Sequence, residues 1–571
     1  MMARVAGLAL VLLLWVTQSA TQELHRTRVV NTTTGPVQGI IKYTHWYGVK
    51  CEVYYGIRYA EPPVGKRRFK PPVPIKPWTY VFNASEEGNA CPQIDYFTYQ
   101  YTGEEDCLVL NVYIPINPID DDPPTFTEFG TVSNLKPVMV WIYGGAYMEG
   151  VSTRSMFGPD FFLEQGVIFV SLNYRLGVAG FLNLGHPDAL GNAGLKDQNL
   201  ALRWVRDNIA NFGGDPNRVT IFGESAGSAS VAYHVLSPKS TGLFSQAILE
   251  SGTPLCQWAY HTPKKAYLNA KNLASKLGYR GNSTQELLDY LLQADIHSLV
   301  VETLRVDAGV LPFRPSIEDT SVATDGSEFL TDCPVNLYKS GNFNKVPTIM
   351  GYNKDETLYF TSALLANNSH TKQLSSFLSR SAGLNGLPNK ILSYFGEAAL
   401  DFTPNVFSEE FVRFSTDIFF VAPIDLTQRL LADQNEGNPI YYYRLSYESA
   451  YTMHSEEGDS INGTAHVDDI DYLFNVDMLH QPRDPNNPFN VFRRKFVRLW
   501  TNFAKYGNPT PLIGIGDQFD VIWEESNLFG VQLDINTTPV LLPRLIDSTA
   551  SSYQRGFLSR LPAETACTST M

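Results

Sequence analysis

The sequence predicts an α/β fold built on one large, mostly parallel central sheet flanked by helices. Continuous apolar runs, typical of buried parallel strands, alternate with stretches of helical periodicity through most of the chain. One apolar run passes through a glycine-rich turn directly into a helical stretch, which is the βα unit of parallel sheets. No internal repeat breaks the alternation, so we expect residues 21–571 to form a single domain.

The predicted elements follow one another as such a fold requires. Residues 137–143 and 167–173 are continuous apolar runs and are predicted to be strands. A helix is expected over 202–212, where apolar residues recur at helical spacing and stop at a Gly-Gly-Asp-Pro cluster. A strand over 219–222 then leads through the turn into a helix over 228–236. Further predicted strands are 246–249, 346–351 and 440–445.

The first 20 residues have the layout of a signal peptide. Arg4 precedes a twelve-residue apolar run, Val5–Val16, which is too short to span a bilayer. Small residues at Ser19 and Ala20 offer a cleavage point, so the mature chain is expected to start near Thr21. No later stretch is apolar enough for a membrane span or a lipid-anchor signal, and we expect a secreted, extracellular protein without a membrane anchor.

Composition agrees with that compartment and excludes some functions. The 44 Lys and Arg residues against 58 Asp and Glu residues give a net charge of −14, which disfavours binding to nucleic acid. Six cysteines without paired CxxC spacing predict one or two disulfides and no zinc site. Six sequons predict N-glycosylation at Asn31, Asn83, Asn282, Asn367, Asn462 and Asn536.

A candidate nucleophile lies in the pentapeptide Gly223–Gly227, which has the form of a nucleophile elbow around Ser225. The pentapeptide lies between a predicted strand and a predicted helix, as the motif requires. Such a serine needs a histidine base and an orienting acid, and in α/β-hydrolases both follow it in the chain. Position alone leaves three candidate bases: His454, His466 and His480.

The run Phe212–Gly227 resembles the serine signature of the type-B carboxylesterase and cholinesterase family, whose members have the α/β-hydrolase fold. The resemblance covers nearly the whole mature chain. Among members of the family, the chain is most similar in character to secreted arthropod carboxylesterases. Other segments that resemble family landmarks are Tyr55–Ile57, Glu105–Leu108, Gly191–Gly194, Asp197–Gln198 and Trp500–Ala504. The resemblance implies hydrolysis of small-molecule esters through an acyl-enzyme, without a metal or cofactor.

The resemblance also implies a catalytic triad of Ser225, Glu356 and His466. In these roles the serine attacks the ester carbonyl, the histidine carries the proton, and the glutamate holds the imidazole in the required tautomer. Asp355 remains an alternative acid because it is adjacent to Glu356, and His454 remains an alternative base together with His480.

Further residues take roles only through the resemblance. The oxyanion hole would consist of the backbone N–H groups of Gly145, Ala146 and Ala226, with Ala146 where many relatives carry glycine. Ser251 would lie near the acid. Cys91 is expected to pair with Cys107, and Cys256 with Cys333 is a weaker pairing; Cys51 and Cys567 are left unassigned.

Three features of the sequence differ from the usual pattern of the family. The loop from Cys91 to Cys107 contains no tryptophan to receive a quaternary ammonium group, so choline esters are disfavoured. Arg58 stands where relatives usually have proline, and Tyr147–Gly150 resembles adhesion proteins of this fold. We therefore expect a secreted, glycosylated carboxylesterase for neutral esters; a lipase-like esterase and a catalytically silent binding protein are the alternatives.

Overall fold

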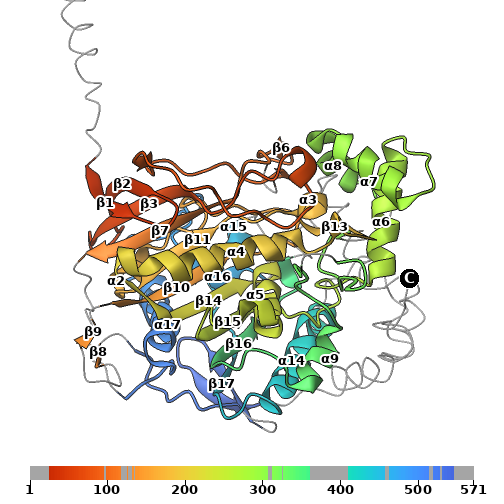
Figure 1. Ribbon diagram of the computed structural model, residues 1–571. Coiled ribbons are helices and arrows are strands. Elements are labelled where there is room, and N and C mark those ends of the chain that lie inside the picture. Colours follow the sequence, from red (N-terminus) through yellow and green to blue (C-terminus); the bar gives the residue numbers. More distant parts are fainter. Residues whose placement is uncertain are drawn as a thin grey trace, which may run out of the picture.

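The computed structural model describes residues 25–95, 98–116, 125–126, 132–133, 135–306, 311–323, 326–359, 409–456, 462–512, 518–526 and 530–544 (Figure 1). Among these residues, one 13-stranded sheet has the order β1-β2-β3-β7-β11-β10-β14-β15-β16-β17-β18-β19, and β4 pairs with β2. The strands from β11 to β18 run parallel, and antiparallel strands extend the sheet at both ends. The predicted α/β architecture is confirmed.

The elements have the following bounds. The strands of the large sheet are β1 (Arg26–Asn31), β2 (Pro36–Tyr43), β3 (Lys50–Arg58), β4 (Phe82–Asn83), β7 (Val109–Ile116), β10 (Lys136–Ile142), β11 (Ile168–Leu172), β14 (Gly214–Glu224), β15 (Gln246–Glu250), β16 (Thr348–Asn353), β17 (Ile440–Leu445), β18 (Val531–Ile535) and β19 (Val540–Pro543). The hairpins outside it are β5 (Gln93–Ile94) with β6 (Tyr101–Thr102), β8 (Thr125–Phe126) with β9 (Val132–Ser133), and β12 (Asn183–His186) with β13 (Ala189–Leu190). The helices are α2 (Asp160–Glu164), α3 (Gly177–Phe181), α4 (Ala193–Asn208), α5 (Ala226–Leu236), α6 (Pro263–Lys276), α7 (Thr284–Gln293), α8 (Ile296–Thr303), α9 (Pro334–Ser340), α13 (Glu409–Thr416), α14 (Ala422–Ala432), α15 (Met453–Glu456), α16 (Asp468–Leu473) and α17 (Pro488–Tyr506), with short 3-10 or π turns at η1 (Gly65–Arg67), η2 (Ile209–Phe212), η3 (Pro238–Ser240) and η5 (Asp417–Val421).

All six predicted strands are present, and the helix predicted over 228–236 is α5. The strand predicted over 219–222 is longer, because β14 begins at Gly214. The register of β14 against β10 shifts within this strand. Lys136 of β10 lies opposite Gly214, but Val138, two residues later, lies opposite Val219. The Gly-Asp-Pro cluster that was expected to separate helix and strand is therefore an irregularity inside the strand.

The helix predicted over 202–212 starts earlier than expected. It is α4, which begins at Ala193, and its last predicted turn is the 3-10 turn η2. Its first half carries the buried polar residues Asp197 and Gln198, which obscure the apolar periodicity. Asp197 accepts from both Nε and Nη2 of Arg175, each at 2.7 Å. The buried face of this half of the helix therefore carries an ion pair instead of apolar side chains, and a search for apolar residues at helical spacing does not detect it.

Helices cover both faces of the sheet. α4 and α5 lie across one face (Figure 1), and α2, α16 and α17 pack on the other. An aromatic cluster joins the second layer to the strands: Trp141 lies 4.8 Å from Phe474 and 4.9 Å from Phe222 between ring centroids, and Phe162 lies 5.5 Å from Phe222. This packing holds the carboxyl ends of β10 and β14 in register, and the candidate site lies at that edge.

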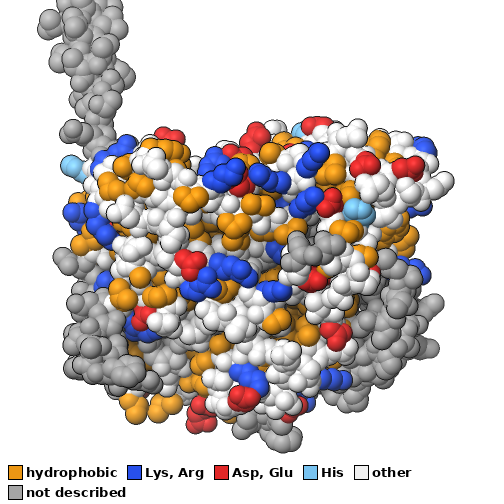
Figure 2. Space-filling view, in the orientation of Figure 1, with side chains coloured by type: hydrophobic (Ala, Val, Ile, Leu, Met, Phe, Trp, Pro, Cys, Tyr) orange, Lys and Arg blue, Asp and Glu red, His pale blue; other side chains and the backbone are white. Residues whose placement is uncertain are grey.

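Within the ranges given above, no helix is both long and apolar enough to cross a membrane. On the face shown in Figure 2, basic and acidic side chains are interspersed with apolar ones. The predicted signal segment 1–20, Asn367 and Cys567 lie outside the described residues.

Asp197→Asn should destabilise the protein by about 3–5 kcal/mol, because it leaves the buried Arg175 guanidinium without its counter-ion. The matched control is Asp207→Asn, which breaks an Arg206–Asp207 pair of the same 2.7 Å length whose side chains are 45% and 44% exposed. That change should cost about 1 kcal/mol or less. Chemical denaturation measures both; equal losses would contradict the role assigned to burial.

Candidate functional site

Ser225 occupies the turn between β14 and α5. Its backbone has φ 56° and ψ −119°, in the left-handed half of conformational space that non-glycine residues rarely adopt. Strain of this kind costs on the order of 1–3 kcal/mol and persists only where the surrounding structure enforces it. The residue is half-buried, whereas Glu224 before it and Ala226 after it are buried, so the turn presents the serine side chain outward.

The two glycines of the motif explain how the turn is enforced. A Cβ atom on Gly223 or on Gly227 would collide with the carbonyl oxygen of Ile142 in β10. At Gly227 it would also lie 2.8 Å from the Tyr143 carbonyl carbon. The start of α5 therefore lies directly against the end of β10, at a separation that only glycine permits. This close approach is the physical reason for the Gly-x-Ser-x-Gly spacing.

The structure brings Ser225, His466 and Glu356 together in one hydrogen-bonded chain. His466 Nε2 lies 2.8 Å from Ser225 Oγ, and His466 Nδ1 lies 2.6 Å from Glu356 Oε2. The second Glu356 oxygen accepts from the Asn353 backbone N–H at 2.8 Å. His466 is 4% exposed and Glu356 is fully buried. Ser251 is also buried, and its N–H donates to the Gly351 carbonyl of β16 at 3.0 Å.

The alternative acid and bases lie elsewhere. Asp355 Oδ2 accepts from the Thr464 N–H at 3.1 Å rather than facing a histidine. His454 Nδ1 lies 2.8 Å from Asp468 Oδ1. His480 is exposed and lines a surface hollow on the loop after α16. The geometry therefore favours Glu356 and His466 over these alternatives.

The glycine-rich turn after β10 lies beside Ser225. Gly145 has φ 93° and Ala146 has φ 58°, so the chain bends sharply. A Cβ atom on the preceding Gly144 would lie 3.1 Å from Ser225 Cβ. Within the described ranges, the N–H groups of Gly145, Ala146 and Ala226 have no protein acceptor; the third is an unpaired donor of the first turn of α5. An oxyanion hole requires unpaired backbone donors of this kind, and the assignment of these three N–H groups to it stays a prediction.

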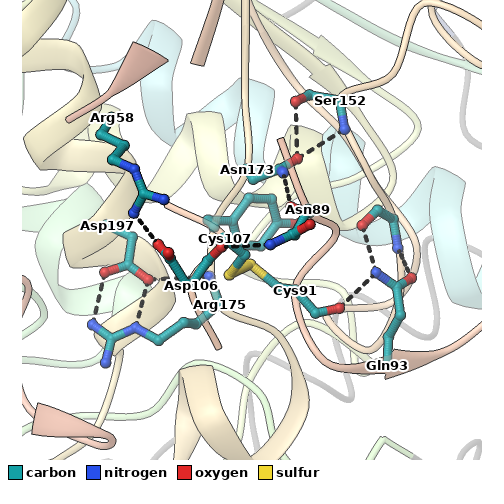
Figure 3. The surroundings of a disulfide bond; sticks show 12 residues. Arg58, Asn89, Cys91, Gln93, Asp106, Cys107, Ser152, Asn173, Arg175 and Asp197 are labelled. Carbon is teal, nitrogen blue, oxygen red and sulfur yellow. Dashed lines mark hydrogen bonds and ion pairs between the residues drawn. A yellow bond between two sulfur atoms is a disulfide. The ribbon is translucent and has the colours of Figure 1, made fainter. Parts of the chain in front are cut away.

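A disulfide joins Cys91 and Cys107, and its surroundings tie this loop to the glycine-rich turn (Figure 3). Gln93 Nε2 donates to the Gly150 carbonyl at 2.9 Å, and the Gly150 N–H donates back to Gln93 Oε1 at 2.8 Å. Arg58, the residue that departs from the family pattern, forms an ion pair with Asp106 next to the disulfide. The arginine at position 58 thus adds an ion pair that connects β3 to the loop closed by the disulfide.

The weaker disulfide prediction is wrong. Cys256 is a buried free cysteine, whereas Cys333 forms a disulfide with a different cysteine. Burial raises the pKa of the Cys256 thiol to about 12, so it remains protonated and unreactive at neutral pH. Cys51 is also a buried free cysteine.

A group of buried carboxyls beside the triad was missed from the sequence. Glu224 Oε1 lies 3.1 Å from His466 Nε2. Burial, and then the charges of Asp469, Glu356 and Glu250, raise the pKa of Glu224 well above its usual range. Burial and the Glu356 charge raise the pKa of Asp469 to about 7. The raised pKa values favour the protonated, uncharged form of these groups and so limit the negative charge around His466.

The sequence pointed to the region of two of these buried carboxyls but not to the third. Glu224 lies inside the serine motif and Asp469 lies three residues after His466, so both were close to residues already singled out. Glu250, whose Oε1 accepts from Trp500 Nε1 at 2.6 Å, is brought in by the pairing of β14 with β15. That convergence depends on strand order, which local sequence does not reveal.

Aromatic side chains line the other side of the histidine. The Phe420 ring lies 4.9 Å from the His466 ring and 6.0 Å from Trp258. Phe420 belongs to the π turn η5, a rare geometry often found at functional sites. The Tyr359 ring lies 6.5 Å from His466. Phe420 is buried, whereas Trp258 and Tyr359 are half-buried, and partly exposed aromatic rings of this kind suit uncharged substrate groups.

The chain is similar to known esterases in both sequence and structure. The model of the carboxylesterase family matches residues 26–544. The chain is 34% identical over 514 residues to juvenile hormone esterase of Tribolium castaneum, covering 85% of this chain and 84% of that protein. It is 33% identical over 506 residues to a cholinesterase of Mus musculus (84% and 79%) and 33% identical over 511 residues to venom carboxylesterase-6 of Apis mellifera (84% and 86%). Among solved structures, juvenile hormone esterase from Manduca sexta with OTFP covalently attached has a TM-score of 0.78 and 26% identity, covering 94% of this chain and 99% of that chain.

Gly227→Ala should abolish accumulation of folded protein, because the added carbon has no space between α5 and β10. The control is Gly242→Ala, at φ 74° with nothing within 4 Å of the added carbon, which should cost only about 1–2 kcal/mol of backbone strain. Yield of folded protein and melting temperature measure both. A Gly227→Ala protein as stable as the control would contradict the close-packed turn.

Asp469→Asn should change how stability depends on pH. Because folding raises the pKa of Asp469 to about 7, the folded state binds more protons than the unfolded state between about pH 4 and 7. The contribution of Asp469 to the free energy of unfolding therefore falls as the pH rises through that window.

The asparagine variant lacks this titration, so its stability relative to the wild type should rise by about 4 kcal/mol between pH 4 and pH 8. Denaturant unfolding at the two pH values measures it. A difference of the same size at pH 4 and pH 8 would contradict the raised pKa.

Proposed function

This chain belongs to the carboxylesterase family and is a carboxylic-ester hydrolase, and we propose that it is a secreted serine esterase that uses Ser225, His466 and Glu356 to hydrolyse neutral esters. The observation that carries the assignment is the position of His466, whose two ring nitrogens lie 2.8 Å from the Ser225 hydroxyl and 2.6 Å from the Glu356 carboxylate. A serine, a base and an orienting acid in this sequence of contacts are the requirements for an activated nucleophile.

In the acylation step, Ser225 Oγ attacks the ester carbonyl while His466 Nε2 accepts the hydroxyl proton. Glu356 accepts from His466 Nδ1–H, which selects the tautomer with a free lone pair on Nε2. The carboxylate also stabilises the imidazolium that forms. The Asn353 N–H fixes the other oxygen of Glu356, so that the carboxylate is already oriented before the substrate binds.

The tetrahedral intermediate carries its negative charge on the former carbonyl oxygen. The N–H groups of Gly145, Ala146 and Ala226 would donate to that oxygen, and donors fixed by the backbone need no rearrangement during the reaction. His466 then gives its proton to the leaving alcohol. A water molecule, activated by the same histidine, releases the acid from Ser225 and restores the enzyme.

The substrate class follows from the surroundings of the triad. The rings of Phe420 and Trp258 offer apolar contacts, and the loop closed by Cys91 and Cys107 has no tryptophan for a quaternary ammonium group. Relatives include a juvenile hormone esterase and a venom carboxylesterase of insects as well as a cholinesterase. These features support neutral carboxylic esters rather than choline esters.

Secretion is supported by the accessibility of the sequons. Asn31, Asn83, Asn282 and Asn462 are exposed, as glycan attachment requires. Asn536 is half-buried and its Nδ2 donates to Asp534 at 2.9 Å, which competes with glycan attachment. We therefore expect glycans at the four exposed positions before any at Asn536.

Ser225→Ala should lower kcat for a neutral ester such as 4-nitrophenyl butyrate by about 10⁴–10⁶-fold, because the nucleophile is lost. The protein should still be secreted and fold, since alanine adds no atom to the turn. Initial rates at saturating ester measure the effect. Retained hydrolysis at the wild-type rate would remove Ser225 as the nucleophile and leave the alternative of a different catalytic centre.

The identity of the acid can be tested in the same assay. Glu356→Gln removes the charge that stabilises the imidazolium and should lower kcat by about 10²–10⁴-fold. Asp355→Asn, the matched control on the adjacent residue, removes the charge but keeps an oxygen that can accept from the Thr464 N–H, and it should cost at least tenfold less. The reverse order would assign the acid to Asp355.

Expression in a secretory cell line should release a protein that begins near Thr21 and carries N-glycans at Asn31, Asn83, Asn282 and Asn462. N-terminal sequencing, and peptide mass before and after enzymatic deglycosylation, measure this. Retention in the cell with residues 1–20 attached would contradict secretion.

A further inference from the structure

The segment that carries His466 is held on one side by the segment that carries Glu356. The Asp355 N–H donates to the Thr464 carbonyl at 2.9 Å, and Asn353 Nδ2 donates to the Ala465 carbonyl at 2.8 Å. The His466 N–H itself donates to the Glu356 carbonyl at 3.1 Å. These contacts fix the distance between the two segments, but they all lie on one side of His466.

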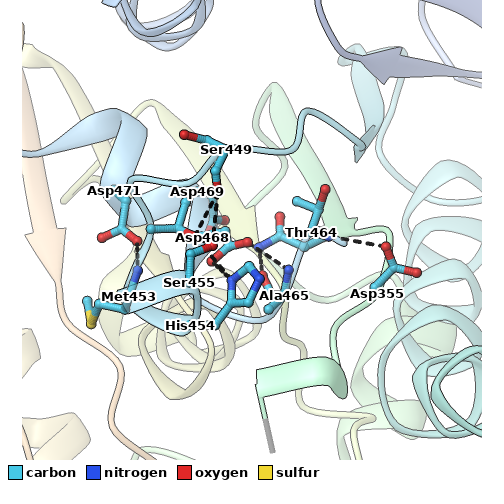
Figure 4. Close-up of polar contacts among 12 residues, drawn as sticks. Asp355, Ser449, Met453, His454, Ser455, Thr464, Ala465, Asp468, Asp469 and Asp471 are labelled. Carbon is cyan, nitrogen blue, oxygen red and sulfur yellow. Dashed lines mark hydrogen bonds and ion pairs between the residues drawn. The ribbon is translucent and has the colours of Figure 1, made fainter. Parts of the chain in front are cut away.

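The other side of the segment is held by a buried histidine–carboxylate pair (Figure 4). Asp468 Oδ2 accepts from the Ala465 N–H at 2.8 Å, and Asp468 Oδ1 lies 2.8 Å from His454 Nδ1. His454 is 2% exposed and Asp468 is 1% exposed. His454 comes from α15, whose first residue is itself fixed because the Met453 N–H donates to Asp471 Oδ2 at 2.7 Å.

This second set of contacts opposes local strain. Val467, between His466 and Asp468, has φ 70°, a conformation that is costly for a β-branched residue. Without an external hold, the segment would relax towards an ordinary backbone conformation and move the imidazole. Displacement of a catalytic group by about 1 Å can cost on the order of 100-fold in rate.

The charge state of Asp468 depends on the same histidine. Burial raises the pKa of Asp468, and the hydrogen bond and charge of His454 are the largest effects that lower it. Asp469 and Asp471 are adjacent buried carboxyls on α16, and Arg493 approaches Asp471 from α17. Removal of His454 would therefore leave Asp468 among carboxyls, favour its protonated form and weaken its hold on the Ala465 N–H.

We propose that His454 is a positioning residue for His466, which it holds in place through Asp468 and the Ala465 backbone. The proposal rests on the proposed function, in which His466 is the base. It gives His454, which sequence position alone made a candidate base, a role that never touches the substrate. His454 donates from Nδ1 to Asp468 Oδ1, and Asp468 Oδ2 in turn accepts from the residue before His466.

A pair of substitutions tests the role. In His454→Asn the side-chain Nδ2 stands as many bonds from the backbone as His454 Nδ1 does, so it can still donate to Asp468. His454→Leu has similar bulk and no donor. For the leucine variant we expect kcat per active site to fall at least tenfold while KM stays within about twofold; the asparagine variant should stay within about threefold of wild-type kcat.

Titration with a fluorophosphonate counts reactive Ser225 sites, so that kcat refers to folded, competent enzyme and loss of protein does not mimic loss of rate. His186→Asn is the control and should leave kcat unchanged, because the His186 ring contacts Gln285 Oε1 and accepts from the Asp188 N–H, each at 3.1 Å, and neither partner belongs to the segment that carries His466.

Two results would overturn the proposal. Wild-type kcat per site in the leucine variant would show that His454 does not position His466. Equal loss of kcat in the asparagine and leucine variants, in step with their melting temperatures, would show that His454 serves stability alone. If the wild type itself is not labelled on Ser225, the proposed function fails, and the positioning role fails with it.

Discussion

The close contact between the start of α5 and the end of β10 is the constraint on which the site depends. Gly223 and Gly227 lie so near the Ile142 carbonyl that neither position can carry a side chain. Ser225, between them, must take a left-handed backbone conformation, and its hydroxyl is thereby turned out of the sheet. The aromatic cluster around Trp141 holds the two strands in register and so maintains this contact.

The parallel sheet brings the other catalytic candidates to the same edge. Glu356 follows β16 and His466 follows β17, and both strands end on the side where β14 ends. Burial of Glu224, Glu250 and Asp469 next to this edge creates an electrostatic problem, because several carboxylates would surround one imidazole. Their raised pKa values reduce this problem, since the uncharged form of each carboxyl is favoured, while Glu356 Oε2 stays in direct contact with His466 Nδ1.

Much of this architecture could be predicted from the sequence, and the errors have physical causes. The buried strands were found because parallel strands covered on both faces are continuously apolar. The first half of α4 was missed because the buried Arg175–Asp197 pair interrupts its periodicity, and β14 was shortened because a bulge accommodates Asp215 and Pro216. The candidate nucleophile was visible from local chemistry alone, whereas the assignments of Glu356 and His466 came from family resemblance.

Other features required the three-dimensional structure. The pairing of Cys256 with Cys333 was wrong because family resemblance did not show which sulfurs meet in this chain: Cys256 is free, and Cys333 is bonded to a different cysteine. Glu250 and Phe420 reach the site through strand order and a π turn, and His454 reaches the loop of His466 from a short helix twelve residues earlier in the chain. The most direct test of the account is the mass of tryptic peptides after exposure of the folded, secreted protein to a fluorophosphonate, which labels serines activated by their surroundings. The account predicts one adduct, on the peptide containing Ser225, and none in Ser225→Ala; no adduct on folded protein, or an adduct on a different serine, would contradict it.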